Sequence, residues 1–141
     1  MCIRDSVAAA YEQLAPATEL RFVGPPNCYV DEGQKRELLR TCRAVVHASL
    51  FEGFGLPVLE ALAHGAPLLC SDLPPLREIA GDVARYVNPR DPASIEAGLA
   101  AVHSDQALRQ KQVDEGPGRA AQFSLRRLVD GWRRVHAEVL A

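Results

Sequence analysis

The sequence has few of the features that mark secreted, membrane or nucleic-acid-binding proteins. Its four cysteines form no CxxC pair and are too sparse for a disulfide scaffold in 141 residues, which indicates reduced thiols. It contains no run of about 18 apolar residues that would predict a membrane span. The formal net charge of −2 lacks the basic excess typical of nucleic-acid binders. We therefore expect a cytoplasmic protein without a nucleic-acid partner, and leave open whether a full-length protein attaches to a membrane surface.

The composition is that of a folded chain. It is 48% hydrophobic and 24% charged, a balance that excludes disorder as the general state. Residues 1–6 do not share the pattern of the residues after them, and they lead into no apolar segment of a signal peptide. We take them as an out-of-pattern edge and expect one domain, or part of one, over residues 7–141.

Short apolar runs alternate with helical patterns. The predicted strands are 19–23, 44–48, 67–70 and 84–87. The predicted helices are 7–14, 32–43, 55–64, 76–80, 91–103, 105–114 and 119–123, with an interruption at 116–118. Asp31 and Asp91 are the expected N-caps, and Gly65 is expected to end the helix before it. The alternation predicts an α/β fold with a parallel sheet, in which the strand 44–48 is buried on both faces.

The most informative segment is the loop after the strand 44–48. Ligands bind parallel α/β sheets at the carboxyl ends of the strands, where loops lead into helices. Gly53 and Gly55 let the backbone bend and approach a ligand closely. The free N–H groups and the dipole of the next helix favour a phosphate or diphosphate at its N-terminus.

Two carboxylates accompany this predicted anion site. Glu52 lies in the loop and Glu60 lies one to two turns into the helix. A carboxylate beside a phosphate is unfavourable unless it faces another part of the ligand, such as vicinal hydroxyls. A diphosphate flanked by hydroxyls, as in a nucleotide sugar, would suit both residues. Two plainer interpretations stay open: Glu60 is an ordinary exposed helix residue, or Glu52 is a charge favoured by the helix dipole.

The residues around this loop resemble the GT-B retaining glycosyltransferases of family 4. The segment 52–63 contains the E-x7-E signature of that family, from Glu52 to Glu60. The resemblance covers residues 7–141 and includes the shorter segments 21–24, 65–67, 71–72, 76–82, 87–92 and 119–124. It implies a Rossmann-like C-terminal domain that holds a nucleoside-diphosphate sugar, with no cofactor and no metal.

The resemblance also implies a role for individual residues. Glu52 would be the catalytic residue and would contact hydroxyls of the donor sugar, while Glu60 would hold the ribose hydroxyls. Gly24 and Pro25 would lie near the base. The implied donor-binding residues are Glu52, Gly53, Phe54, Gly55, Leu56 and Glu60. Such an enzyme transfers the sugar with retention to a glycan, lipid or small-molecule acceptor.

The domain is expected to be incomplete on its N-terminal side. The family's first strand and its Arg/Lys loop are not found in the sequence, and the strand 19–23 would have no neighbour to join it to 44–48. We also expect the family's N-terminal domain, which would supply the acceptor site, to lie outside this chain, so the chain alone is expected to be inactive. Two alternatives are a non-catalytic nucleotide-sugar-binding module and a hydrolase with a Glu52–Glu60 acid/base pair, which we rank last.

The remaining features receive plain structural interpretations. The histidines show no metal-ligand spacing, and we interpret them as structural or surface residues; they are His47, His64, His103 and His136. Asp72 is expected to cap the turn after it. The segment 124–141 has apolar residues at helical spacing, which predicts an amphipathic helix docked on a core.

Overall fold

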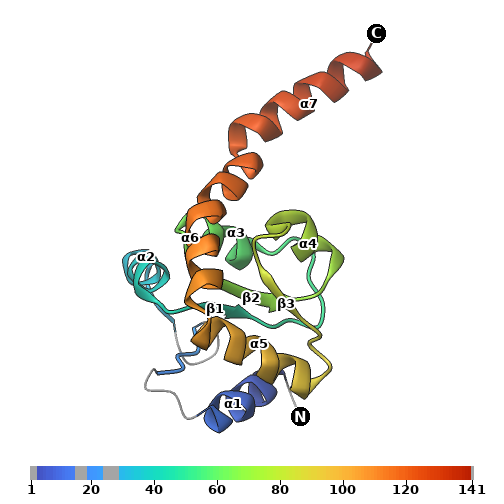
Figure 1. The fold of residues 1–141 in the computed structure, drawn as a ribbon. Helices are drawn as coiled ribbons and strands as arrows, with labels where there is room; N and C mark the ends of the chain where they lie inside the picture. The colour runs from blue at the N-terminus through green and yellow to red at the C-terminus, as the bar shows by residue number, and fades with distance from the viewer. Residues whose placement is uncertain (1–2, 15–18, 24–28, 141) are drawn as a thin grey trace.

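The computed structural model of the chain describes residues 3–14, 19–23 and 29–140 (Figure 1). The elements are α1 (Ile3–Gln13), α2 (Glu32–Thr41), β1 (Val45–His47), α3 (Leu56–Ala63), β2 (Leu68–Ser71), α4 (Pro74–Ala80), β3 (Arg85–Val87), α5 (Pro92–Ser104), α6 (Gln106–Ala120), the 3-10 turn η1 (Ala121–Phe123) and α7 (Leu125–Val139). Strands and helices alternate from β1 to α5, which confirms the predicted α/β class. Helix α1 begins at Ile3, four residues before the expected bound.

The sheet is parallel, in the order β1-β2-β3, and β2 is its buried centre. Successive side chains of a strand point to opposite faces, so β2 contributes side chains to two hydrophobic clusters. Leu68 and Cys70 pack with residues of α3 and α4, whereas Leu69 packs with residues of α1 and α5. Figure 1 shows the same division, with α1 and α5 on one side of the sheet and α3 and α4 on the other.

Strand β1 is only half-buried, so the expectation of a strand buried on both faces is wrong there. Among the described residues β1 pairs with β2 alone, which makes it an edge strand. The predicted strand 19–23 is also absent: its residues are described but belong to no strand. A cleft of about 1090 Å³ is lined by Leu20 and Phe22 of this segment and by Val45 and Val46 of β1. An isolated segment forms no ladder because its backbone groups have no neighbouring strand to bond.

The helix boundaries follow local signals where those are strong. Asp31 accepts a hydrogen bond from the Gln34 N–H at 2.8 Å, and the Asp31 N–H donates to the Gln34 side chain at 3.0 Å. This reciprocal pair is a capping box, and it begins α2 where expected. Asp91 caps α5 by accepting from the Ala93 N–H, and Gly65, with φ of 66°, follows the end of α3. All three predictions are confirmed.

Helix α6 passes through Pro117 without the interruption predicted at 116–118. Tertiary packing explains the difference. Gly116 is buried against α3, where a Cβ would lie 3.1 Å from the carbonyl oxygen of Leu62. The close approach of the two helices, which glycine permits, stabilises α6 at a place where its sequence alone predicts a break.

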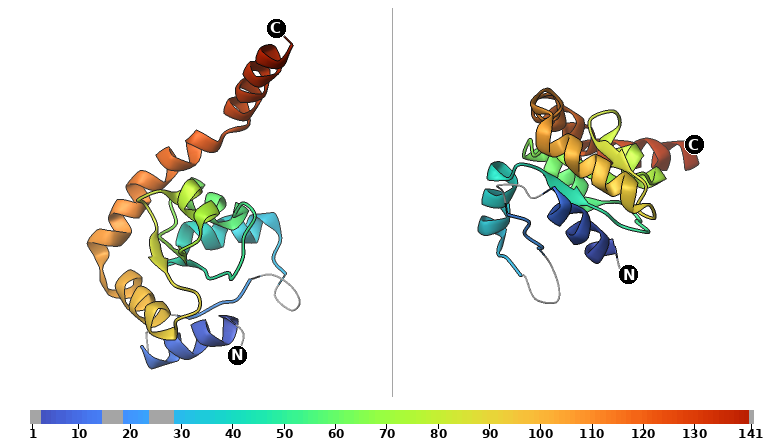
Figure 2. Two further views of the ribbon diagram at one scale, coloured as in Figure 1. Left: turned by 90° about the vertical axis from the view of Figure 1, so that its right-hand side faces the viewer. Right: turned by 60° about the horizontal axis from the view of Figure 1, so that its bottom comes forward.

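Helix α7 is not docked on the core, which contradicts the expectation for segment 124–141. Ser124 caps it, and it then projects away from the rest of the chain (Figures 1 and 2). Its apolar side chains are exposed; Trp132, the only tryptophan, is 69% exposed. The exposed set is Leu125, Leu128, Val129, Trp132, Val135, Val139 and Leu140.

We predict that deleting residues 125–141 leaves the thermal midpoint within about 2 °C of the full chain, because α7 buries no residue. Circular dichroism at 222 nm would follow the melt. A deletion that begins at Gln106 is the contrasting control, since it also removes the buried Gln112 and should unfold the chain. A fall of more than about 5 °C for the shorter deletion would mean that α7 packs on the core in solution.

Candidate functional site

The loop between β1 and α3 lies at the carboxyl end of the sheet, and Gly55 ends it in a left-handed conformation. Gly55 is the N-cap of α3, with φ of 103° and ψ of 48°. A Cβ at this position would lie 2.4 Å from Cδ2 of Leu76. Both the backbone angle and the close contact require glycine there. At Gly53, by contrast, a Cβ would meet no heavy atom within 4 Å.

The N-terminus of α3 offers fewer free donors than the sequence suggested. Pro57 has no N–H, and the N–H groups of Val58 and Leu59 both donate to the Gly55 carbonyl, at 3.0 and 3.1 Å. The first-turn N–H without an intrahelical partner is that of Leu56. An anion at this end of α3 would therefore be held by the Leu56 amide, by loop amides before it and by the helix dipole.

The base of the loop is tied to the neighbouring strand by a buried hydroxyl. Ser71 Oγ accepts a hydrogen bond from the Ser49 N–H at 2.9 Å and donates one to the Ser49 carbonyl at 2.7 Å. Ser71 is fully buried at the end of β2. These bonds fix the point where the loop leaves β1. Ser49 Oγ itself is buried and has no hydrogen-bond partner within the described part of the chain.

Glu52 is held by two donors from different parts of the site. Its Oε2 lies 2.9 Å from Nε2 of His47, and its Oε1 accepts from the Gly53 N–H at 3.2 Å. The hydrogen bond from His47 is the main cause that lowers the pKa of Glu52 below its usual value, against the opposing effect of burial. Glu52 is therefore ionised at neutral pH. Sequence analysis left His47 as a structural or surface residue and missed this contact.

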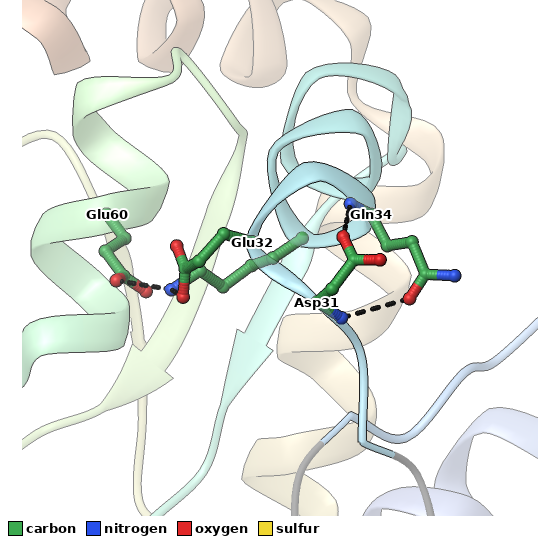
Figure 3. Close-up of polar contacts among 5 residues, drawn as sticks. Asp31, Glu32, Gln34 and Glu60 are labelled. Carbon is green, nitrogen blue, oxygen red and sulfur yellow. Dashed lines mark hydrogen bonds and ion pairs between the residues drawn. The ribbon is translucent and has the colours of Figure 1, made fainter.

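Glu60 on α3 is paired with Lys35 on α2. Lys35 Nζ lies 2.8 Å from Glu60 Oε1 and 3.0 Å from Glu32 Oε1. Figure 3 shows the carboxylates of Glu60 and Glu32 beside the same side-chain nitrogen, next to the capping box of Asp31 and Gln34. Hydrogen bonds to Glu60 and then Glu32 raise the pKa of Lys35 above its usual value, so the lysine stays protonated. Sequence analysis had no signal for Lys35, which lies 25 residues before Glu60.

The other predicted site residues form an exposed apolar rim. Phe54 is half-exposed, and its ring meets that of Phe123 edge to face, with centroids 6.5 Å apart. Leu56 is exposed at the start of α3. Gly24 and Pro25, the predicted base loop, lie outside the described residues. Glu52 stays close to the glycine loop, with its Cγ 3.7 Å from a Cβ built at Gly55, whereas Glu60 contacts Lys35 on α2.

Asp72 does not cap the next turn as expected. It forms a two-point ion pair with Arg77, one bond of which joins Arg77 Nη2 to Asp72 Oδ2 at 2.8 Å. The N-cap of α4 is Leu73, which makes no side-chain capping bond. The pairing with Arg77 lowers the pKa of Asp72, and the guanidinium of Arg77 lies 4.3 Å over the ring of Tyr86. Asp72 thus stabilises the turn after β2 through a charge pair.

The described part of the chain contains neither of two features that would suggest another kind of site. No helix in ranges 3–14, 19–23 and 29–140 is long and apolar enough to cross a membrane. In the same ranges, no three histidine, cysteine, aspartate or glutamate side chains come together as a metal would require.

The fold and the loop define an α/β unit of the Rossmann-like kind, with a candidate ligand-binding segment between β1 and α3. The sequence pattern of the family described as Glycosyl transferases group 1 matches residues 10–119. The chain belongs to this family, which confirms the resemblance found in the sequence.

Known relatives and a solved structure agree with this assignment. "O-antigen chain mannosyltransferase B" of Escherichia coli is 34% identical over 105 residues, which are 74% of this chain and 26% of that protein. "Glycogen synthase" of Mycobacterium tuberculosis (strain ATCC 25618 / H37Rv) is 37% identical over 94 residues, 65% of this chain and 22% of that protein. The structure of sucrose-phosphate synthase from Thermosynechococcus elongatus matches 97% of this chain and 34% of its own, with a TM-score of 0.71 at 19% identity.

These matches define the extent of the chain as well as its fold. The chain spans about a quarter of the length of these two relatives, and about a third of the sucrose-phosphate synthase chain. Its three-stranded parallel sheet and flanking helices correspond to part of a GT-B fold. The activity of a whole protein containing this unit is therefore a matter for proposal.

Proposed function

We propose that the chain is the donor-binding part of a retaining glycosyltransferase that takes a sugar from a nucleoside-diphosphate sugar. One observation carries the proposal: along the chain, the N–H of Leu56 at the start of α3, which has no intrahelical partner, lies between two carboxylates, Glu52 in the loop and Glu60 on the helix. The diphosphate would lie at the amide of Leu56 and the loop before it. Glu52 would accept hydrogen bonds from hydroxyls of the sugar, and Glu60 from hydroxyls of the ribose.

The charges around the site support these roles. Glu52 is ionised, which makes it an acceptor only and suits it to hydroxyl donors. The contacts of Glu60 within the described residues go to its Oε1, so Oε2 is available to a ribose hydroxyl. The helix dipole and amides would stabilise the negative charge that grows on the leaving diphosphate. Glu52, beside the reacting sugar, is our candidate catalytic residue.

The acceptor site would lie in the rest of a longer protein. A chain that spans about a quarter of the length of its relatives is shorter than one of two equal domains. We expect the isolated chain to bind a donor weakly and to transfer no sugar to a glycan, lipid or small molecule. Measurable transfer by the purified chain would contradict this expectation. The matched relatives include mannosyltransferases and glycogen synthases, so the sugar has to be found by titration.

We predict that Glu60→Gln weakens donor binding by about 10-fold or more, because a hydrogen bond to a charged acceptor is worth about 1.5–3 kcal/mol. Chemical-shift perturbation with UDP-glucose, GDP-mannose and their free diphosphates would measure it at millimolar ligand. Glu138→Gln, on the exposed far end of α7, is the matched control and should bind as the parent does. Absence of binding to every ligand, or equal binding by the two variants, would refute the proposed function.

A further inference from the structure

Glu52 owes its position to a residue outside the glycine loop. His47 is the last residue of β1, and its backbone is fixed opposite Cys70 of β2. Its Nε2 lies 2.9 Å from Glu52 Oε2, and both side chains are largely covered, at 21% and 23% exposure. The Gly53 N–H holds the second carboxylate oxygen at 3.2 Å. Each oxygen of the carboxylate thus has its own donor, one on the sheet and one on the loop.

We infer that His47 is a positioning residue that holds the Glu52 carboxylate ready for the hydroxyls of the donor sugar. A glutamate side chain has several rotatable bonds, and a ligand that must order it binds more weakly. A hydrogen-bond donor on a rigid strand orders the glutamate side chain before the ligand arrives. The ligand then does not have to supply the free energy of that ordering. This inference rests on the proposed function, since it assigns the sugar to Glu52.

The contact of His47 with Glu52 is not needed to hold the backbone of the loop in place. The loop backbone is anchored independently by the Ser49–Ser71 hydrogen bonds at the ends of β1 and β2. Gly55 is fixed by its own packing against Leu76. Removing the imidazole should therefore release the carboxylate of Glu52 without releasing the backbone that holds the diphosphate. The consequence is specific: binding that depends on the sugar weakens, whereas binding of the bare nucleoside diphosphate does not.

The test compares His47→Ala with His47→Gln, whose amide nitrogen can replace Nε2 as a donor to Glu52. We expect His47→Ala to weaken the binding of UDP-glucose or GDP-mannose about 10-fold, while UDP and GDP bind as tightly as to the parent chain. His47→Gln should keep most of the parent's affinity for the nucleotide sugar. His136→Gln, on exposed α7, is the control histidine. In Glu52→Gln the effect of His47→Ala should disappear, because its target carboxylate is gone.

A second readout needs no ligand. Carbon-13 titration of the Glu52 carboxyl, assigned by its loss in Glu52→Gln, should move to a higher pKa in His47→Ala, because the hydrogen bond that favours the ionised form is lost. An unchanged titration would overturn the inference. Equal weakening of bare diphosphate and nucleotide sugar would also overturn it, since that marks a structural role. If the parent chain binds no nucleotide while the titration still shifts, the proposed function fails and the positioning role fails with it.

Discussion

Replacing Gly55 by alanine is expected to destabilise the chain by about 3 kcal/mol or more. The residue has φ of 103°, a backbone region that costs a non-glycine residue about 1–3 kcal/mol. The added Cβ would also lie 2.4 Å from Leu76 Cδ2 and 3.6 Å from Ile79 Cδ1. Leu76 is fully buried and cannot move aside, so overpacking adds about 1–3 kcal/mol.

Gly53→Ala is the matched control for that change, because it lies in the same loop with open space around it. It should alter the free energy of unfolding by less than about 0.5 kcal/mol. Urea denaturation of both variants and the parent would measure the difference. If the two alanines destabilise equally, the left-handed conformation of Gly55 is not maintained in solution. Donor titration of Gly53→Ala adds a test of close ligand approach, since a methyl group there would meet open space rather than the core.

The order of elements and the location of the loop could be predicted from the sequence because both depend on local signals. Asp31, Asp91 and Gly65 mark helix ends by hydrogen bonds and angles that involve residues within a few positions. Short apolar runs between them predicted β1, β2 and β3 to within two residues at either end. The pair of glutamates came from the same local pattern, and the family assignment confirms the resemblance around them.

The contacts that complete the site could not be predicted, because they join segments far apart in the chain. Lys35 on α2 and Glu60 on α3 are 25 residues apart in the sequence and meet only in the folded chain. The mistaken strand 19–23 and the mistaken docking of 124–141 have a related cause: each pattern predicts an element but not the surface it needs. The base-loop role of Gly24 and Pro25 stays a prediction.

The second large effect is expected at Gln112, a polar residue that the sequence analysis did not single out. It is 1% exposed within α6. Its Oε1 accepts from the Leu68 N–H at 3.2 Å, and its Nε2 donates to the carbonyls of Leu68 and Val83 at 2.9 and 2.8 Å. One side-chain amide thus satisfies three backbone groups: the N–H and carbonyl of Leu68 at the start of β2, and the carbonyl of Val83 just before β3.

Gln112→Leu should therefore destabilise the chain by about 3–5 kcal/mol. Each buried backbone group that loses its partner costs about 1–3 kcal/mol, and the apolar leucine offsets only part of the sum. Gln110→Leu, two residues earlier on the exposed face, loses only a surface bond to Asp114 and should change stability by less than about 0.5 kcal/mol. Urea denaturation would compare the stabilities of the two variants from their midpoints, provided that the dependence of the unfolding free energy on urea concentration is the same. Strand β2 ends at Ser71, which anchors the loop of Glu52. The loss of the Gln112 hydrogen bonds should therefore also lower the affinity of the folded protein for the sugar donor. Equal stability of the two leucine variants would mean that water, rather than Gln112, satisfies the strand ends.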